Sequence, residues 1–543
     1  MGRQPTCEFR GLPAPGCAVI LMQALHRTQI PRSLTALLAL LAGLGLAAGF
    51  APWGLWPLTI TGVGLLTWLV ADSTPRVGFA VGMLAGCALY GTTIWWVGAQ
   101  AGPMVWALVV VMAVWVGLLG AMSSLITRLP GWCFLVPLSW GAIEYGAGQI
   151  PFGGFPWLRL GHTTIDQPLA GWLPLVGTPG ATWLVAMAGC CCLAVVVQRH
   201  RLVPLLSIIG VFIIGGGVLL LPAERGGEGI SVGMVQGNAQ LGLHGGYISA
   251  TGATPLHLSE TIFLLADARA HGRDLDMIVW AENSTDTDPM RNPTTQKQVS
   301  AAVELAQVPL DLGAITAGPE PQTRQTTTLI WVQEQGIVDR YHKRNLAPFG
   351  EFVPYRDVLE PIFPDVKRAG YQSIPGTNPG VVTVPTPTDP DLRAGTVICY
   401  ELAYDQTVYD TVTNGAEILV AQSTTHNFSG TIEPQQQMNM NRVRAAELGR
   451  EFIASTLNGY SGLIDTRGGL HEPTREYTAA HRIYTVPKRN NVTLAVYLAP
   501  ILGPTQVLGC LLAAGFGVRA VRIAHRAGSL ERTSTNSDEQ EKQ

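Results

Sequence analysis

Charged side chains are scarce in this chain. They make up 13% of its 543 residues, whereas 47% of the residues are hydrophobic. Because soluble domains carry about 25% charged residues, this composition excludes a soluble globular protein over the whole length. The shortage is concentrated between Ser33 and Leu221, where the only charged residues are Asp72, Arg76, Arg128, Glu144, Arg159, Asp166, Arg199 and Arg201. Most of that stretch could lie in hydrocarbon.

Long apolar runs fill this part of the chain. A spanning helix needs about 20 apolar residues to cross a hydrocarbon layer of about 30 Å. Eight segments satisfy this requirement, and the Pro-rich fifth is the weakest of them. They lie near 33–51, 56–71, 77–98, 103–126, 132–148, 168–197, 203–221 and 493–516.

Basic residues test this count, because Lys and Arg concentrate in short cytoplasmic loops. If the chain crosses eight times, nearly all basic residues near the helices fall on one side, and among the opposite loops only one contains an arginine, Arg159. This predicts that both termini are cytoplasmic and that a large domain after the seventh helix is extracytoplasmic. The residues on the cytoplasmic side are Arg3, Arg10, Arg27, Arg32, Arg76, Arg128, Arg199, Arg201, Arg519, Arg522, Arg526 and Arg532.

These patterns divide the chain into a membrane α-helical bundle of about eight spans and an α/β domain. The predicted parts are a cytoplasmic arm (1–32), seven membrane helices (33–222), the extracytoplasmic domain (223–492), an eighth helix (493–518) and a disordered cytoplasmic tail (519–543).

The extracytoplasmic domain almost lacks cysteine. Of nine cysteines, eight lie in the arm or the membrane helices, and only Cys399 lies in the domain. A disulfide framework within the domain is therefore excluded. A lone thiol in an oxidising compartment is either a buried packing residue or a reactive group.

Three chemically capable residues each follow a predicted strand of this domain. Glu282 follows the apolar run 277–280, and Cys399 follows the run 395–398. Lys343 follows a predicted hairpin of 328–332 and 336–341. Strand ends collect reactive groups, because the sheet is rigid and the following loops are open.

Together these residues predict acyl transfer through a thioester. A cysteine at a strand-to-helix turn gains from the helix start, which lowers the thiol pKa and offers N–H groups to an oxyanion. Glu282 could then take the thiol proton, and Lys343 could stabilise the negative charge. Taken singly, Glu282 could equally be a solvated cap and Lys343 a surface charge.

The stretches around these residues resemble the carbon-nitrogen hydrolase (nitrilase) superfamily. They are Trp280–Glu282, Ile398–Glu401 and fourteen consecutive residues, Tyr341–Pro354. The last stretch, combined with the membrane part, is similar to the apolipoprotein N-acyltransferase family. This resemblance spans about 33–526 and implies an α-β-β-α sandwich.

The resemblance also implies an activity and its partners. A fatty acyl chain would pass from a phospholipid to Cys399, and then to the α-amino group of a lipoprotein's diacylglyceryl cysteine. No cofactor, metal or nucleic acid is expected, and we expect a monomer in the bacterial plasma membrane. The implied roles are Glu282 as base, Lys343 as oxyanion stabiliser, Cys399 as nucleophile, Glu351 as support, Glu401 as the group that orients Lys343 or the amine, and Tyr400 in the acyl pocket. For Glu351 and Glu401 a structural ion pair is the alternative.

The sequence departs from the family pattern in three places. Ala281 replaces a usual proline, and Ser423–Phe428 replaces an Asn-Asp-Thr/Ala-Trp-Phe run. Gln236–Asn238 matches the start of the domain, but the tryptophan that some relatives use as a gate is missing there, and His244 or Tyr247 could serve instead.

Two further features lie near the expected membrane surface. The apolar residues Val358, Leu359, Ile362, Phe363 and Val366 follow the lysine motif, and we expect them to form an interfacial lid; packing on their own domain is the alternative. Glu144 lies at the edge of the fifth helix, and we expect it near the outer interface, close to Gln149 and Arg159.

Two rival functions remain open at this stage. A membrane-tethered amidase would use the same three residues to release its product to water. A transporter or binding scaffold would not need the Cys399 thiol at all.

Overall fold

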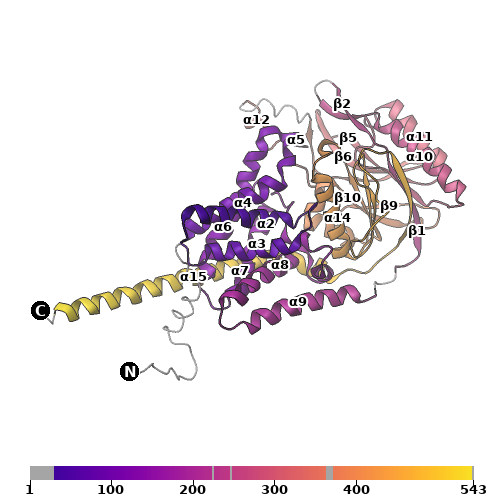
Figure 1. Ribbon diagram of the computed structural model, residues 1–543. Helices are drawn as coiled ribbons and strands as arrows, with labels where there is room; N and C mark the ends of the chain where they lie inside the picture. Colours follow the sequence, from indigo (N-terminus) through magenta and orange to yellow (C-terminus); the bar gives the residue numbers. More distant parts are fainter. Residues whose placement is uncertain (1–29, 223–225, 245–246, 362–370, 541–543) are drawn as a thin grey trace.

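The computed structural model describes residues 30–222, 226–244, 247–361 and 371–540. The helices before residue 222 form one lobe, and two β-sheets with their covering helices form the other (Figure 1). The predicted lid residues Ile362, Phe363 and Val366 lie outside the described residues, as does most of the N-terminal arm.

All seven segments expected before the domain contain a helix. The third helix ends earlier than expected, at Thr93, and short helical turns follow over Trp95–Met104. The sixth begins as a 3-10 turn, Pro168–Trp172, and is kinked at Gly177. The helices are α2 (Arg32–Ala48), α3 (Trp56–Val70), α4 (Pro75–Thr93), α6 (Val105–Ile126), α7 (Trp132–Ala147), α8 (Leu173–Val197) and α9 (Leu202–Leu220).

Within the part of the chain that the structure describes, four helical stretches are long and apolar enough to cross a membrane. They are Trp95–Ile126, Pro168–Val197, Leu202–Leu220 and Leu494–Ile523. Arg32–Ala48 and Trp56–Val70 are apolar but shorter. The chain is therefore a membrane protein by composition and length of its helices, while the count of eight spans stays a prediction.

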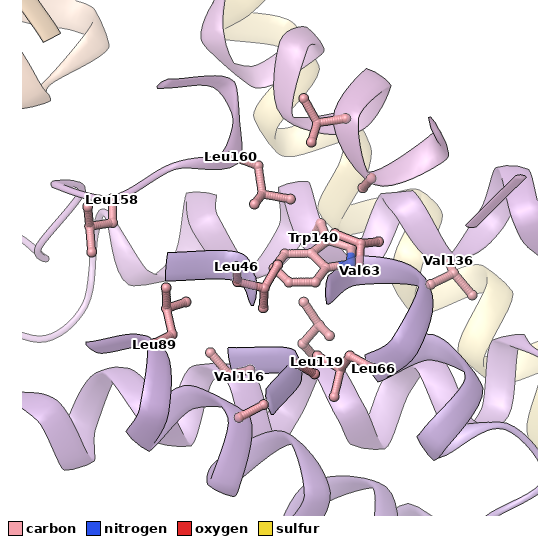
Figure 2. Close-up of a cluster of buried hydrophobic side chains, with 14 of the residues drawn as sticks. Leu46, Val63, Leu66, Leu89, Val116, Leu119, Val136, Trp140, Leu158 and Leu160 are labelled. Atoms are coloured by element: carbon pink, nitrogen blue, oxygen red, sulfur yellow. The ribbon is translucent and has the colours of Figure 1, made fainter. Parts of the chain in front are cut away.

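Glycines let the membrane helices approach closely. On α4, Gly78, Gly82 and Gly86 are spaced four residues apart and face α6; a Cβ added at Gly82 would lie 2.2 Å from the carbonyl oxygen of Val116. Small residues at this spacing are a common means of helix packing in membranes, where burial from water supplies no drive. Around these contacts, Leu46, Val63, Leu66 and Trp140 join one buried apolar cluster (Figure 2).

The domain after α9 contains two large sheets. The first has the order β15-β1-β4-β5-β6-β7, with β8 beside β6, and the second has the order β14-β13-β12-β11-β10-β9. The first comprises β1 (Gly229–Gln236), β4 (Met277–Val279), β5 (Leu310–Ala317), β6 (Thr323–Val332), β7 (Gly336–His342), β8 (Gln372–Ser373) and β15 (Ala480–Pro487). The second comprises β9 (Val381–Val384), β10 (Leu392–Ile398), β11 (Ile418–Ser423), β12 (Phe452–Thr456), β13 (Gly462–Ile464) and β14 (Leu470–His471).

The two sheets pack face to face, and helices cover their outer faces. Between the sheets, Val232 and Val279 of the first share a buried cluster with Ile398 and Val420 of the second. Helices α10 (Ala253–Ala270) and α11 (Pro293–Ala306) cover the first sheet, while α13 (Asp405–Thr413) and α14 (Glu433–Leu448) cover the second. This four-layer arrangement confirms the expected α/β domain.

Buried polar bonds also join the two sheets. The Gln422 side chain on β11 donates to the Trp280 carbonyl oxygen and to Asp311 Oδ1, both at 2.9 Å. Its Oε1 atom accepts from Thr328 Oγ1 at 2.5 Å. These bonds hold the end of β4 against the end of β11, where the site residues begin.

The C-terminal helix differs from expectation. We expected a disordered tail after residue 518, but α15 runs from Leu494 to Gln540 without a break. Its prolines, Pro500 and Pro504, lie near the start, and no proline follows to stop the helix.

A buried ionic network joins the domain to the membrane lobe. Asp405 Oδ1 accepts from Arg159 at 2.6 Å and from Arg444 at 2.7 Å. The Thr178 N–H on α8 donates to Glu447 Oε1 at 2.6 Å. A carboxylate oxygen of Glu144 lies 3.7 Å from Arg159 Nε, which agrees with the expected closeness of these two residues.

Candidate active site

Glu282 lies three residues after the end of β4 and is almost wholly buried, with 2% of its surface exposed. Its Oε2 atom accepts from the Thr424 N–H at 2.8 Å. Burial raises the pKa of the Glu282 carboxyl, and the Lys343 charge opposes that rise. A buried carboxylate with a raised pKa is a stronger base than an exposed one.

Lys343 follows β7, and its ammonium lies between two carboxylates. Its Nζ atom is 3.1 Å from Glu282 Oε1 and 2.9 Å from Glu351 Oε1. Burial acts to lower the pKa of Lys343, but the charges of Glu282 and Glu351 outweigh it and hold the pKa well above its ordinary value. The side chain is therefore a fixed cation within the domain.

Glu351 is tied both to Lys343 and to the loop that carries it. Its Oε2 atom accepts from the Ala347 N–H at 2.8 Å, and its Oε1 atom also accepts from Thr326 Oγ1 at 3.2 Å. The loop thus folds back so that its own carboxylate fixes the ammonium. The ion pair that we gave as the alternative for Glu351 lies inside the site.

Cys399 follows β10 with a left-handed backbone conformation, at φ 51°. Such a conformation costs of order 1–3 kcal/mol for a residue with a side chain. The Gln437 amide on α14 donates to its Sγ atom at 3.4 Å. The residue as a whole is half-buried.

The expectation that a helix start lowers the pKa of Cys399 is wrong. The element that begins at Cys399 is only a five-residue 3-10 turn, Cys399–Ala403, and not the start of a long helix. Burial raises the pKa of the Cys399 thiol, the Glu282 charge raises it further, and Lys343 opposes both. The thiol therefore keeps its proton and needs a base to remove it.

Glu401 does not contact the Lys343 ammonium, and it forms no ion pair with another described residue. Its carboxylate instead accepts from Tyr341 Oη at 2.7 Å and from three backbone N–H groups, those of Arg344, Asn345 and Ile398. These donors belong to the lysine loop and to the end of β10. Glu401 thereby holds the loop of Lys343 beside the strand of Cys399.

Tyr400 points toward the membrane lobe. Its ring stacks on Trp157 at 6.1 Å between centroids, and its hydroxyl donates to the Gly154 carbonyl oxygen at 3.2 Å. Both partners belong to the loop between α7 and α8. The expected place of Tyr400 in an acyl pocket stays a prediction.

The sequence did not indicate three residues that contribute to the site. Gln437 and Glu433 lie on α14, more than 30 residues after Cys399, and Thr424 acts through its backbone. Thr424 belongs to the segment that departs from the family pattern, so that segment still contacts the site. The proposed gate residues His244 and Tyr247 face each other across the hairpin β2 (Gln240–His244) and β3 (Tyr247–Thr251), but their side chains lie outside the described part.

A Glu, a Lys and a Cys brought to adjoining strand ends of a four-layer α/β sandwich define a carbon-nitrogen hydrolase. The comparisons agree. The family model "Carbon-nitrogen hydrolase" matches residues 248–477, and the model "Apolipoprotein N-acyltransferase N-terminal domain" matches residues 42–191.

Relatives extend this match over most of the chain. An apolipoprotein N-acyltransferase from Vibrio parahaemolyticus is 27% identical and covers 84% of this chain and 90% of its own length. Its counterpart from Mycolicibacterium smegmatis is 28% identical and covers 89% of this chain and 84% of its own length. The chain therefore belongs to the apolipoprotein N-acyltransferase family, and it is an enzyme.

Solved structures similar to this chain include an amidase of the nitrilase superfamily from Nesterenkonia sp. AN1. A cysteine-to-alanine mutant of that amidase is 13% identical and covers 51% of this chain and 95% of its own, with a TM-score of 0.34. A glutamate-to-leucine mutant, with an acetamide moiety bound to its active-site cysteine, has the same identity, coverage and TM-score.

Proposed function

We propose that the chain transfers a fatty acyl chain from a membrane phospholipid to the α-amino group of a lipoprotein's diacylglyceryl cysteine, through a thioester on Cys399. The observation that supports this most strongly is the buried contact of Lys343 with Glu282 beside a thiol whose pKa is raised. A protonated thiol next to a buried base and a fixed cation suits nucleophilic catalysis.

In the first half-reaction, Glu282 takes the proton of Cys399, and the sulfur attacks the ester carbonyl of the phospholipid. Lys343 stabilises the tetrahedral oxyanion. The carbon–oxygen bond then breaks, Glu282 returns the proton to the leaving alkoxide, and a lysophospholipid departs. Cys399 is left as a thioester.

In the second half-reaction, the acceptor amine attacks the thioester carbonyl, with Lys343 again opposite the oxyanion. The carbon–sulfur bond breaks and an amide forms. Glu282 carries one proton from nitrogen to the departing thiolate, which restores the thiol. Glu351 and Glu401 act as positioning residues, because they hold the ammonium and the loop that bears it.

We also propose the eight-span arrangement, with both termini cytoplasmic and the domain extracytoplasmic, in a monomer. The seven helices before the domain and α15 supply eight segments, and arginines concentrate on one side of them. Both lipid substrates lie in the bilayer, so an active site next to the membrane lobe is accessible to them. A C-terminal epitope that antibody reaches in intact spheroplasts would contradict this arrangement.

The activity is tested with purified protein in phospholipid vesicles and a synthetic diacylglyceryl-cysteine peptide. The proposal predicts that the peptide gains the mass of one acyl chain, in an amide that resists hydroxylamine. A membrane-tethered amidase would instead leave the peptide unchanged and release small products to water.

A further inference from the structure

One more carboxyl group, that of Glu433, faces the site, and the mechanism above does not use it. Glu433 is the first residue of α14, and 2% of its surface is exposed. Its Oε2 atom has no hydrogen-bond partner within the described part of the chain. Burying a carboxyl group without a hydrogen-bond partner costs free energy, so the burial of Glu433 needs an explanation.

The helix directs Glu433 toward Cys399. Residues four apart lie on the same face of an α-helix, and Gln437, four residues further on, donates to Cys399 Sγ at 3.4 Å. The pKa values agree with this placement: the charge of Glu433 contributes to raising the pKa of the Cys399 thiol, and the charge of Glu282 contributes to raising the pKa of Glu433.

Among the residues that the structure describes, no cation offsets the charge of an ionised Glu433. Burial raises its pKa well above the ordinary value, and the charges that act on it, Glu476 and Glu282, are both negative. Lys343 is already shared between Glu282 and Glu351. In the free enzyme Glu433 is therefore the neutral acid, because an isolated buried carboxylate would cost more.

The ligand that Glu433 suits follows from these contacts. A buried carboxyl that lies on the helix face directed at Cys399, has an unpartnered oxygen and feels only negative charges matches a ligand that brings N–H donors and positive charge. An α-ammonium group, with the peptide N–H groups that follow it, has this chemistry.

We propose that Glu433 binds the α-ammonium group of the acceptor and takes its first proton before attack on the thioester. This inference rests on the function proposed above and assigns the acceptor side of that site. Glu282 then exchanges protons with the sulfur of Cys399, and Glu433 takes the first proton from the nitrogen of the acceptor.

The proton count closes over one cycle. When the ammonium binds, Glu433 releases its proton to solvent and becomes the counter-ion. The ammonium then gives one proton to Glu433, which yields a neutral amine and restores the neutral acid. The amine nitrogen bonds to the thioester carbon, the carbon–sulfur bond breaks, and the second nitrogen proton reaches the thiolate through Glu282. An α-amino group has an ordinary pKa of about 7.7–8.0, so a carboxylate with a raised pKa is a suitable base for it.

The test measures the two half-reactions separately in the variant Glu433→Gln. Acylation is followed by intact mass after exposure to phospholipid vesicles, and transfer is followed by loss of that acyl group to a diacylglyceryl-cysteine peptide. We expect transfer at pH 7 to slow about 100-fold, the usual worth of a general base, and acylation to slow far less. The transfer deficit should shrink at pH 9, where the acceptor is already a free amine. Equal slowing of both steps, or no slowing, would overturn the inference.

Glu476→Gln is the matched control, because it removes a nearby carboxylate that is half-exposed and accepts from Tyr460 Oη at 3.2 Å. We expect both half-reactions to stay within a few-fold of wild type, since a partly exposed charge is screened by solvent. A loss of transfer in this variant equal to that of Glu433→Gln would count against a specific role for Glu433. Failure of the wild-type protein to acquire an acyl chain at all would instead overturn the proposed function.

A second measurement needs no variant and so does not depend on the folding of Glu433→Gln. Two peptide analogues are compared as inhibitors of wild-type transfer: one with a dimethylated α-amine, which stays cationic and cannot form an amide, and one that lacks the amine. The inference predicts that the cationic analogue inhibits at least about tenfold more strongly, as for a charged hydrogen bond. Equal inhibition by the two analogues would overturn it.

Discussion

Lys343 Nζ lies 3.1 Å from Glu282 Oε1, and each of these residues exposes only 2% of its surface. Two opposite charges removed from water depend on each other, because the loss of either leaves the other buried without a partner. The pair therefore links the stability of the domain to the chemistry proposed for it.

The first prediction concerns this pair. Lys343→Met should destabilise the protein by about 3–5 kcal/mol, because it leaves the carboxylates of Glu282 and Glu351 without their counter-charge. Adding Glu282→Gln to Lys343→Met should recover part of that loss, while neither protein forms an acyl adduct. Denaturant unfolding in detergent of four proteins, the wild type, Lys343→Met, Glu282→Gln and the double variant, measures the effect. If the loss in the double variant equals the sum of the two single losses, the two groups do not interact.

The backbone at Cys399 gives a second prediction. At φ 51° a glycine is unstrained but an alanine is not, so Cys399→Gly should be more stable than Cys399→Ala by about 1 kcal/mol. Both variants should lack activity completely, because both lack the sulfur. The comparison needs only two melting curves, and an alanine variant at least as stable as the glycine variant would contradict the strained conformation.

A third prediction tests Glu401 as a positioning residue. Its carboxylate accepts from three backbone N–H groups and from Tyr341 Oη. Tyr341→Phe removes one of the four donors and should cost about 1–2 kcal/mol, whereas Glu401→Gln disturbs all of them and should cost more and reduce acylation strongly. If Glu401→Gln acylates at the wild-type rate, the carboxylate does not hold the lysine loop in place.

Much of this site could be predicted because its residues follow strands. Apolar runs ending in Glu282, Lys343 and Cys399 give the strand ends directly, and the resemblance to the superfamily adds their roles. The contacts of Glu401 and the part that Gln437 plays could not be predicted, because they depend on which loop and which helix pack against those ends. The raised pKa of Cys399 was missed for a similar reason. Sequence indicates a turn after the strand, but it does not show that the turn is a short 3-10 helix or how deeply the thiol is buried.

A fourth prediction concerns the junction of the two lobes. Burial acts to raise the pKa of Asp405, but Arg159 and Arg444 hold it below its ordinary range. Asp405→Asn leaves two buried guanidinium groups without their shared carboxylate, so we expect a loss of about 3–5 kcal/mol. Asp391→Asn, at an exposed position, should change stability by less than about 0.5 kcal/mol. Similar melting temperatures for both variants would mean that the network contributes little.

The fifth prediction is the pH dependence of acylation. Glu282 must be ionised to take the thiol proton, and its pKa is raised by burial. The rate should therefore fall as the pH drops through a value above the ordinary glutamate range of about 4.3, and it should not fall near pH 9 through loss of the Lys343 charge. A pH–rate profile of adduct formation measures this. An acidic limb at or below pH 4.3 would argue against Glu282 as the base.

The most direct test of the central claim is peptide mapping by mass spectrometry after the purified protein meets phospholipid vesicles. The account predicts one acyl group, sensitive to hydroxylamine, on the peptide that contains Cys399, and none on Cys399→Ala. Other thiols remain in that variant, including the exposed Cys192. An adduct on Cys192, or an acylated Cys399→Ala protein, would contradict a thioester on the thiol beside Glu282 and Lys343.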